Sequence, residues 1–383
     1  MSFRFTHLAL ENWRNFRKVD LPLRDRLFVV GPNASGKTNL LDALRFLREV
    51  ARPAGSLADA VQSRGGIAHL RSLHARKGNN VRIAVRLEIS GEAWSYDLRI
   101  NGKKDAAPVV VAERILCGST ELLTRPNDAD KADPRQLEQT YLEQLAQNQA
   151  FRQLVDAFAT IQSVHVVPQV VKNLPRHSED VLRDAPGSDF IEQLAELPEK
   201  KRKGALKRIE KLLRPAVPQF KSLRIEREKK SGVPHLEANY THWRPQGGWH
   251  NEREFSEGTL RLIGLLWSLL YGEGPLILEE PELSLHEAVV QQIPSMLARA
   301  AAHKRRQIFV STHANMLMAE GVDPSEVLIL TPTDQDTTAA LASDDKVIVT
   351  AAKAGLPIGM LVAGRTRPTG IEQLKLPFSA AAE

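Results

Sequence analysis

The most informative part of the chain is residues 27–40, which read LFVVGPNASGKTNL. Four apolar residues predict a buried strand, the next eight match G-x-x-x-x-G-K-[ST], and helical spacing of apolar residues follows. In this order, Gly31 and Gly36 let backbone N–H groups surround phosphate oxygens at a helix N-terminus. The motif therefore predicts a nucleoside triphosphate site, with Lys37 on the β- and γ-phosphates and Thr38 on Mg²⁺. The candidate phosphate-binding residues are Gly31, Asn33, Gly36, Lys37, Thr38 and Asn39.

The composition is that of a globular protein with more than one lobe. The chain has 383 residues, of which 42% are hydrophobic and 26% charged, and this length exceeds one ordinary core. A net charge of +6 permits a nucleic-acid partner without requiring one. The single cysteine, Cys117, excludes an intrachain disulfide and a cysteine-based zinc site, and we expect it in the core.

The apolar segments of the chain do not indicate a membrane protein. Charges interrupt the apolar residues at the N-terminus, which is therefore not typical of a signal peptide. The longest apolar run, residues 262–271, is much shorter than the ~20 residues of a membrane span. We therefore expect a cytoplasmic protein without a membrane partner.

Alternating apolar residues predict an antiparallel meander in the first third of the chain. Two of these strands flank Ser90-Gly91-Glu92 and predict a hairpin, and two others flank the polar turn 11–17, ENWRNFR. Residues 127–134 are expected to be a linker. Strands are expected at residues 3–10, 19–23, 81–89, 94–100 and 109–116.

The middle of the chain is expected to be helical and basic. Apolar spacing predicts a helix over residues 135–160 and a short strand over 164–168. From Lys200 to Arg214, eight basic residues stand against one acid. This face is typical of a sequence-independent contact with nucleic-acid phosphates, although a solvated helix face has the same pattern. The apolar side of this helix is expected to hold Ala205, Leu206, Ile209, Leu212 and Leu213.

Two motifs of the second half carry polar groups that suit a phosphate site. Residues 254–261, EFSEGTLR, precede an apolar helix that Ser256 would cap, which leaves helix N–H groups for an anion. Residues 274–282, GPLILEEPE, predict a buried strand that ends in Glu279 and Glu280. Because neighbouring side chains on a strand point to opposite sides, these two carboxylates can take different roles.

The end of the chain adds further strands. Residues 307–313, QIFVSTH, predict a buried strand that ends in His313. Residues 327–330 predict one more strand, and residues 347–350 are a weaker candidate. The last five residues look like a frayed end.

The order of these motifs resembles that of the RecF/SMC-type ATPases, a branch of the ABC superfamily related to the OLD-type proteins. The resemblance covers about the first 330 residues and rests on the Asn-x-Arg-Asn-Phe turn, the phosphate loop, Ser-Glu-Gly-Thr, the acidic strand end and the histidine. It implies an α/β fold, an ABC-type P-loop ATPase core with an antiparallel β subdomain and a helical insertion. The corresponding expected domains are residues 1–130, 131–215 and 216–383.

The resemblance also implies a role for each motif. Arg14 and Asn15 would lie beside the nucleotide base, unless their turn is simply exposed and polar. Glu279 would hold the water shell of Mg²⁺, although most of the family has Asp there. Glu280 would be the general base and His313 would contact the γ-phosphate. Gln162 and Gln169 are the nearby candidates for the family's Q-loop glutamine, and neither sits in a convincing motif.

By the same resemblance, the nucleotide site is completed by a second copy of the chain. Ser256 and Gly258 would bind the γ-phosphate of ATP held by that copy, and residues 281–286 would cross the interface of a homodimer. ATP is the expected nucleotide, because no Asn-Lys-x-Asp motif is present. OLD-type proteins append a TOPRIM nuclease after this region, but Asp334 and Asp336 are expected only in a solvated loop.

We therefore expect a Mg²⁺-dependent ATPase that works as a dimeric switch in DNA maintenance or antiphage defence. It would act on DNA through the basic face from Lys200 to Arg214, or license a separately encoded nuclease or other effector. The alternatives are the cytosolic ATPase subunit of an ABC transporter and a nucleotide-dependent interaction scaffold.

Overall fold

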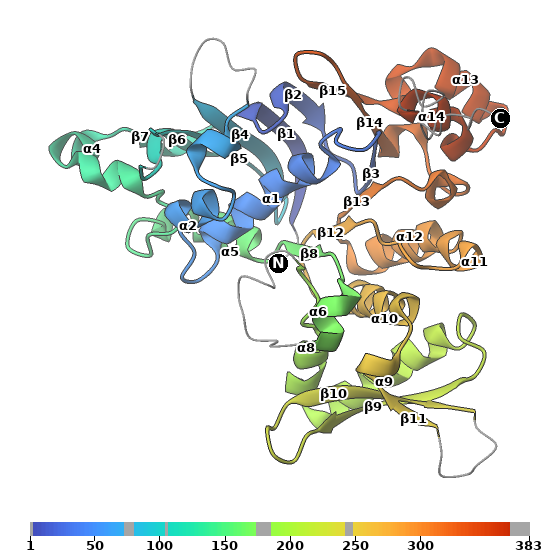
Figure 1. Cartoon of the computed structure of the whole chain (residues 1–383). Coiled ribbons are helices and arrows are strands. Elements are labelled where there is room, and N and C mark those ends of the chain that lie inside the picture. Colours follow the sequence, from blue (N-terminus) through green and yellow to red (C-terminus); the bar gives the residue numbers. More distant parts are fainter. Residues whose placement is uncertain (1–2, 73–79, 104–105, 174–184, 242–247, 368–383) are drawn as a thin grey trace, which may run out of the picture.

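The described residues form two six-stranded sheets and one three-stranded sheet (Figure 1). A mostly parallel sheet forms the centre, an antiparallel sheet lies on one side of it, and the small sheet with its helices lies on another. This is the expected α/β arrangement. The computed structural model describes residues 3–72, 80–103, 106–173, 185–241 and 248–367.

The central sheet has the strand order β15-β14-β3-β13-β12-β8. Neighbouring strands are parallel except β15, which is antiparallel to β14. The carboxyl ends of the parallel strands therefore meet at one edge of the sheet, which is where open α/β sheets bind ligands. The strands are β3 (Arg26–Val30), β8 (Gln162–Val164), β12 (Leu276–Glu279), β13 (Ile308–Thr312), β14 (Val327–Pro332) and β15 (Thr337–Leu341).

Both faces of this sheet are covered, which explains its nearly continuous apolar strands. In β3, Leu27 and Val29 pack into the cluster that contains α1 (Lys37–Ala51), while Phe28 and Val30 pack into the cluster on the other face. The second cluster includes α12 (Ile293–Lys304), α13 (Lys346–Lys353) and α14 (Ile358–Thr366). The alternation fixes the strand between two helical layers.

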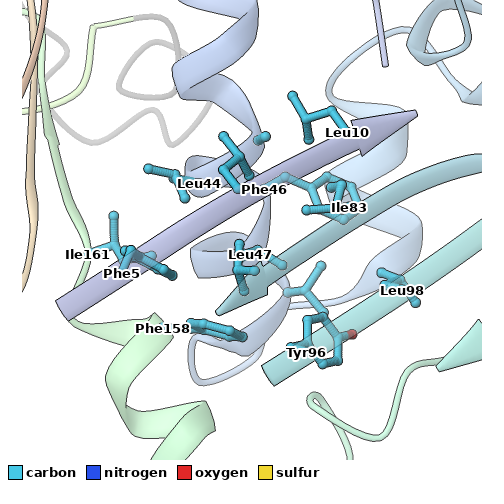
Figure 2. Packing of buried hydrophobic residues seen from close by; sticks show 14 of the residues in the cluster. Phe5, Leu10, Leu44, Phe46, Leu47, Ile83, Tyr96, Leu98, Phe158 and Ile161 are labelled. Atoms are coloured by element: carbon cyan, nitrogen blue, oxygen red, sulfur yellow. The ribbon is translucent and has the colours of Figure 1, made fainter. Parts of the chain in front are cut away.

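The antiparallel sheet has the order β2-β1-β4-β5-β6-β7 and packs on α1 and α5 (Arg152–Ala159). Figure 2 shows the shared core, in which Phe5 of β1 stacks on Phe158 of α5 with ring centroids 6.0 Å apart. The predicted hairpin and the third antiparallel strand are confirmed. The strands are β1 (Phe3–Trp13), β2 (Phe16–Pro22), β4 (Val81–Ile89), β5 (Glu92–Asn101), β6 (Val109–Cys117) and β7 (Thr120–Arg125).

The predicted helix over residues 135–160 is wrong in its first half. Only 3-10 turns and α5 form in this range, and residues 139–148 are irregular. Glu143 accepts hydrogen bonds from the N–H groups of Thr140 at 2.6 Å and Leu57 at 3.1 Å, and Asn148 donates to the carbonyl of Leu142 at 2.9 Å. These bonds between side chains and backbone replace the helical ladder.

Two further predictions fail at helix caps. The expected linker 127–134 contains α4 (Asp128–Ala132), because Asn127 and Asp130 form a reciprocal capping box. The weak strand candidate at 347–350 lies within α13, whose first N–H groups bond the carboxylate of Asp345. In both places a side chain that caps the first N–H groups stabilises a helix, although the local composition favoured a linker or a strand.

Smaller corrections concern the strand at 164–168 and Cys117. The observed strand β8 ends at Val164, and Pro168 begins α6 (Pro168–Asn173). Cys117 lies half-buried at the end of β6, where its thiol contacts Glu92, rather than in the core. Burial and the neighbouring carboxylate raise the pKa of this thiol.

The third sheet, β11-β10-β9, shares a hydrophobic cluster with α8 (Phe190–Glu196), α9 (Glu199–Leu213) and α10 (Glu257–Leu270). The expected domain boundary at 215/216 falls between α9 and β9, which pack in this one cluster. Leu212, predicted on the apolar face of α9, is instead 44% exposed. The strands are β9 (Phe220–Arg227), β10 (Pro234–Tyr240) and β11 (Trp249–Asn251), and the remaining short helices are α2 (Leu57–Gln62), α3 (Ile67–Leu70) and α11 (Glu287–Val290). Among the described helices, none has the length and apolarity to cross a bilayer.

Candidate nucleotide site

The phosphate loop joins the carboxyl end of β3 to the start of α1, as the motif predicts. Gly36 has φ +92°, and a Cβ there would lie 2.1 Å from the side-chain amide of Asn15. A Cβ on Gly31 would lie 2.5 Å from the hydroxyl oxygen of Ser35. A side chain at either position would collide with neighbouring atoms, so both positions require glycine. Gly36 is also required because its backbone is left-handed.

The ammonium of Lys37 is turned back onto the phosphate loop. Its Nζ donates to the carbonyls of Gly31 at 2.9 Å and Pro32 at 3.0 Å, and lies 3.3 Å from Nδ1 of His313. The residue is only 6% exposed. Burial lowers the pKa of Lys37 to about 8, against the opposing effect of Glu280 and Glu282. A phosphate group would relieve this desolvated charge.

Glu279 lies beside Thr38, although 241 residues separate them in sequence. The Thr38 hydroxyl donates to one oxygen of the Glu279 carboxylate at 3.1 Å, and the other oxygen pairs with the guanidinium of Arg45. A hydroxyl and a carboxylate oxygen at this separation are hard ligands of the kind that Mg²⁺ prefers. The residues present therefore fit a magnesium ion.

Glu280 and His313 meet at the ends of the neighbouring strands β12 and β13. Glu280 has φ +45°, and its N–H donates to the Ser311 carbonyl at 2.9 Å. Its carboxylate Oε1 lies 3.1 Å from Nε2 of His313. Burial and the charge of Lys37 lower the pKa of His313. The lowered pKa favours the neutral imidazole, and its contacts suit an Nε2–H that donates to Glu280 and an Nδ1 that accepts from Lys37.

The turn before the phosphate loop supports the loop from its own side. Asn15 donates to the Ser35 carbonyl at 3.0 Å and to the Thr337 hydroxyl at 2.7 Å, and accepts from Asn39 at 2.8 Å. The amides of Asn15 and Asn39 are thus already engaged within the protein. Asn33 is exposed at the tip of the loop.

Arg14 lines one cavity together with Thr38, Asn39 and Glu279. Its guanidinium Nη2 lies 3.9 Å from the Asp42 carboxylate, and burial lowers the pKa of Arg14. The structure thus places Arg14 next to the phosphate loop. Its side chain faces the same cavity as Thr38 and Glu279, the predicted metal ligands.

Ser256 is the N-cap of α10, as predicted, and its hydroxyl accepts from the N–H of Thr259 at 3.1 Å. A Cβ on Gly258 would lie 2.4 Å from the carbonyl oxygen of Ser284. The start of α10 is therefore packed tightly against the segment 281–286 that follows Glu280.

Several charged residues at this site were missed by the sequence analysis. Asp42 is buried on α1 and accepts two hydrogen bonds from Arg64, both at 2.8 Å. Glu282 is also buried, and it accepts from the Thr312 hydroxyl at 2.5 Å and from the N–H of His313 at 3.2 Å. Burial raises the pKa of Glu282. The signal for Asp42 was an acidic residue among the apolar residues of α1. Glu282 ends the predicted acidic stretch 274–282, in which only Glu279 and Glu280 were given a role.

Among the described residues, neither glutamine candidate is hydrogen-bonded to the side chain of Glu279 or Glu280. Gln169 donates to Glu257 at 2.8 Å, and Gln162 accepts from Arg306 at 2.6 Å. The side chain that follows β8 into the site is His165, which lines the cavity with Thr38 and whose Nδ1 lies 3.4 Å from the Glu279 carbonyl. No pattern in the sequence singles out this histidine.

The fold and this motif order are those of a RecF/SMC-like P-loop ATPase. The chain belongs to the family described as "AAA domain, putative AbiEii toxin, Type IV TA system", whose model matches residues 27–319.

Short segments of curated proteins are similar to this chain. Endonuclease GajA of Bacillus cereus (strain VD045) is 46% identical over 44 residues, which are 12% of this chain and 8% of GajA. The DNA replication and repair protein RecF of Roseiflexus castenholzii is 43% identical over 49 residues, 12% of each chain. RecF of a Synechococcus strain is 33% identical over 105 residues, 27% of this chain and 26% of that RecF. Each match thus spans only a minor part of the relative's length.

Solved structures of Smc heads share the fold over nearly the whole chain. An Smc head bound to the C-winged helix domain of ScpA aligns with a TM-score of 0.56 and 15% identity, and the alignment covers 89% of this chain and 99% of that chain. The Smc head from Pyrococcus furiosus, with an extended coiled coil, gives a TM-score of 0.55 and 14% identity, covering 92% and 100%. At these identities the likeness concerns the fold.

Proposed function

We propose that this protein binds and hydrolyses ATP at the end of β3 and acts in the cytoplasm as a dimeric switch. The observation that carries the proposal is the convergence of Lys37, Thr38, Glu279, Glu280 and His313 at one edge of the central sheet. Family membership supports the nucleotide, because the matching model describes an AAA domain.

In the proposed mechanism, Lys37 leaves the loop carbonyls and donates to the phosphates of ATP. Glu280 accepts a proton from the attacking water, and the neutral imidazole of His313 holds the Glu280 carboxylate in place. Thr38 and Glu279 would hold Mg²⁺, which when bound neutralises phosphate charge. Arg14 lies close enough to the loop to contact the nucleotide beyond its phosphates.

The second half of each site would come from another copy of the chain. The first N–H groups of a helix have no partner inside it, and at the start of α10 they carry the positive end of the helix dipole. We propose that Ser256 and Gly258 present these groups to the γ-phosphate of ATP bound by the second copy. ATP would then favour the closed dimer, because only that state supplies both halves of the site.

The test compares the parent protein with Glu280→Gln. We expect turnover to fall at least about 100-fold, with retained ATP binding and an ATP-dependent dimer by size-exclusion chromatography with light scattering. Lys37→Ala should lose binding as well as turnover. Turnover at the parent rate in Glu280→Gln would show that Glu280 is not the general base, and an ATP-bound monomer would contradict the switch.

DNA is the partner that the charge distribution supports best. The residues Lys200, Lys201, Lys207, Arg208 and Lys211 of α9 are exposed, while Ala205, Leu206, Ile209 and Leu213 anchor the helix in its hydrophobic cluster. A fixed cationic helix face of this kind suits the phosphates of a nucleic acid. The match to segments of RecF proteins, which are named for DNA replication and repair, agrees with this choice.

The DNA proposal is tested by ATP turnover and duplex binding at two salt concentrations. The triple substitution Lys200→Gln, Lys207→Gln, Lys211→Gln should weaken duplex binding and reduce its salt dependence, by about one unit of slope for each DNA phosphate that is no longer neutralised. Lys353→Gln, an exposed lysine of α13, is the matched control. Duplex binding that is equal in all three proteins would remove α9 from the DNA proposal.

A second candidate function is the licensing of a separate effector protein. The similarity to a segment of Endonuclease GajA favours a nuclease as that effector, and the resemblance to OLD-type proteins makes antiphage defence the proposed setting. Turnover that ignores DNA, together with an ATP-dependent complex with a nuclease, would support this candidate over the first. A complex with a membrane protein would instead support the ATPase subunit of a transporter, and binding partners without turnover would support a scaffold.

A further inference from the structure

A second cavity lies beside the edge strand β8 and adjoins the nucleotide cavity, with which it shares Arg45 and Glu49 in its lining. It has a volume of about 340 Å³ and is lined by residues of α1, β8 and α10 and by residues between 186 and 193. Figure 1 shows α1 and α10 as separate helices that both approach β8. Its lining includes Gln162, the first residue of β8. The cavity therefore extends to the amino ends of the parallel strands, whereas the phosphate loop lies at their carboxyl ends. Along α1, Arg48 lies about 16 Å from Lys37.

Three arginines line this cavity: Arg45 and Arg48 of α1, and Arg52, which follows the helix as its C-cap. Arg45 and Arg48 are three residues apart and therefore share one face of the helix. Arg45 is paired with Glu279. Within the described part of the chain, the Nε atoms of Arg48 and Arg52 are buried without a hydrogen-bond partner. Burial and the charge of Arg52 lower the pKa of Arg48.

Two carboxylates also line the cavity, and they do not balance these charges. Glu49 is engaged by the guanidinium of Arg64 at 2.5 Å. Glu49 and Asp189 both favour the charged form of Arg48, but only through space. The two arginines therefore keep donor groups that neither carboxylate satisfies. An unpaired guanidinium in a partly desolvated site is costly, so this arrangement suits a bound anion.

A buried hydroxyl adds a neutral donor to the same wall. Ser163 of β8 is 7% exposed, and its Oγ has no hydrogen-bond partner among the described residues. It lines the cavity that the arginines face. On the α10 side, Trp267 stacks on Tyr271 with ring centroids 4.1 Å apart, and both rings line the cavity. The site thus combines cationic and hydroxyl donors with an aromatic wall.

We propose that this cavity, the α1–α10 site, binds a phosphate-bearing ligand through Arg48, Arg52 and Ser163. Guanidinium groups match phosphate oxygens with paired hydrogen bonds, and a serine hydroxyl supplies a third donor. The volume admits a ligand of about mononucleotide size, at the lower end of small-molecule pockets. The source of the phosphate is a free phosphate ester or the phosphorylated end of a nucleic-acid strand.

Occupancy of this site would connect the two helices of the proposed nucleotide machinery. α1 begins at Lys37, and α10 is capped by Ser256. A ligand held between α1 and α10 contacts the far parts of both helices. The inference goes beyond the proposed function and does not depend on ATP hydrolysis, because it concerns binding at different residues.

The test is calorimetric titration of the full chain with inorganic pyrophosphate. The Lys37→Ala background weakens binding at the phosphate loop and isolates the second site. Within that background, Arg48→Gln with Arg52→Gln should bind pyrophosphate at least about tenfold more weakly, and Ser163→Ala should bind it more weakly to a smaller extent. Arg299→Gln, which removes an exposed arginine from α12, is the matched control and should bind normally. Thermal unfolding checks that each variant is folded.

Three results would overturn the α1–α10 site. Pyrophosphate binding that vanishes in Lys37→Ala alone would assign all of it to the phosphate loop. Equal binding in the arginine pair variant and in Arg299→Gln would show that Arg48 and Arg52 do not contact the ligand. The third result concerns ATP binding without pyrophosphate, measured in a protein that carries both arginine substitutions and retains Lys37. If this protein binds ATP more weakly than the parent, the substitutions disturb the phosphate loop instead. Repeating the titration with AMP and with a 5′-phosphorylated dinucleotide distinguishes the two sources.

Discussion

The guanidinium of Arg45 is paired with the carboxylate of Glu279, which joins the middle of α1 to the end of β12. The other Glu279 oxygen accepts a hydrogen bond from Thr38 at 3.1 Å. A cationic side chain thus holds the proposed metal ligand in position, and it also competes with a metal ion for the same negative charge.

We therefore expect Arg45→Gln to lower the Mg²⁺ concentration that half-saturates the site, about threefold to tenfold. Loss of a guanidinium next to Glu279 makes the local potential more negative, and a divalent cation gains from that change. Mn²⁺ binding measured by electron paramagnetic resonance in the presence of ATP checks this directly. Arg299→Gln serves as the control, and an unchanged or weaker Mn²⁺ affinity in Arg45→Gln would contradict the competition.

Nucleotide binding should take up protons at mildly alkaline pH. The pKa of Lys37 is lowered to about 8 by burial, and a bound phosphate raises it again because it favours the ammonium. At pH 8 we expect uptake of about half a proton per site, and close to none at pH 6.5, where Lys37 is already charged. ATP affinity should accordingly fall as the pH rises above 8.

Calorimetry in two buffers of different ionisation enthalpy measures this uptake. Binding heats that are independent of the buffer at pH 8 would show that Lys37 is fully charged before ATP binds. Lys207→Gln, an exposed lysine of α9, should leave the uptake unchanged.

Gly258→Ala should prevent closure of the proposed dimer while leaving the phosphate loop intact. A methyl group there would lie 2.4 Å from the Ser284 carbonyl, so the start of α10 must move away from the segment 281–286. We expect normal ATP binding to the monomer, measured by calorimetry, and no ATP-dependent dimer by light scattering. Gly204→Ala in α9, where a Cβ meets nothing within 4 Å, is the matched control. A normal dimer in Gly258→Ala would show that this contact does not shape the interface.

Arg125→Ala should destabilise the antiparallel sheet by about 3–5 kcal/mol, because it leaves buried carboxylates without a partner. Arg125 is fully buried and pairs with Glu113 at 3.0 Å and Asp130 at 2.7 Å. Burial raises the pKa of Glu113 despite these contacts. Chemical unfolding measures the change. Arg114→Ala breaks an exposed pair with Glu121 on the same sheet and should cost at most about 1 kcal/mol; equal losses in the two variants would refute the argument from burial.

Local chemistry explains why the phosphate loop, the two terminal carboxylates and the terminal histidine could be predicted from sequence. Each lies at the carboxyl end of an apolar strand, and parallel strands bring those ends to one edge of the sheet. The prediction of secondary structure failed where a side chain forms hydrogen bonds with backbone N–H groups close to it in sequence. Glu143 and Asp345 are examples, because their carboxylates bind N–H groups and so decide between helix, strand and turn.

Strand length, apolar content and glycine positions are local properties, and for this reason β3, β12, β13 and β14 could be predicted from sequence. The strand β15, the bounds of β8 and the order of the strands were not predicted. The charge environment of the site depends on tertiary packing. Arg45 reaches Glu279 across 234 residues, and His165 enters the site from a segment without a motif. Glu282 belongs to the predicted acidic stretch, but its contacts with Thr312 and His313 come from tertiary packing. Long-range pairing of charged groups depends on how α1, β8 and β12 pack, and burial sets the strength of each pair. The same packing encloses the α1–α10 site, which no stretch of the sequence marks by itself.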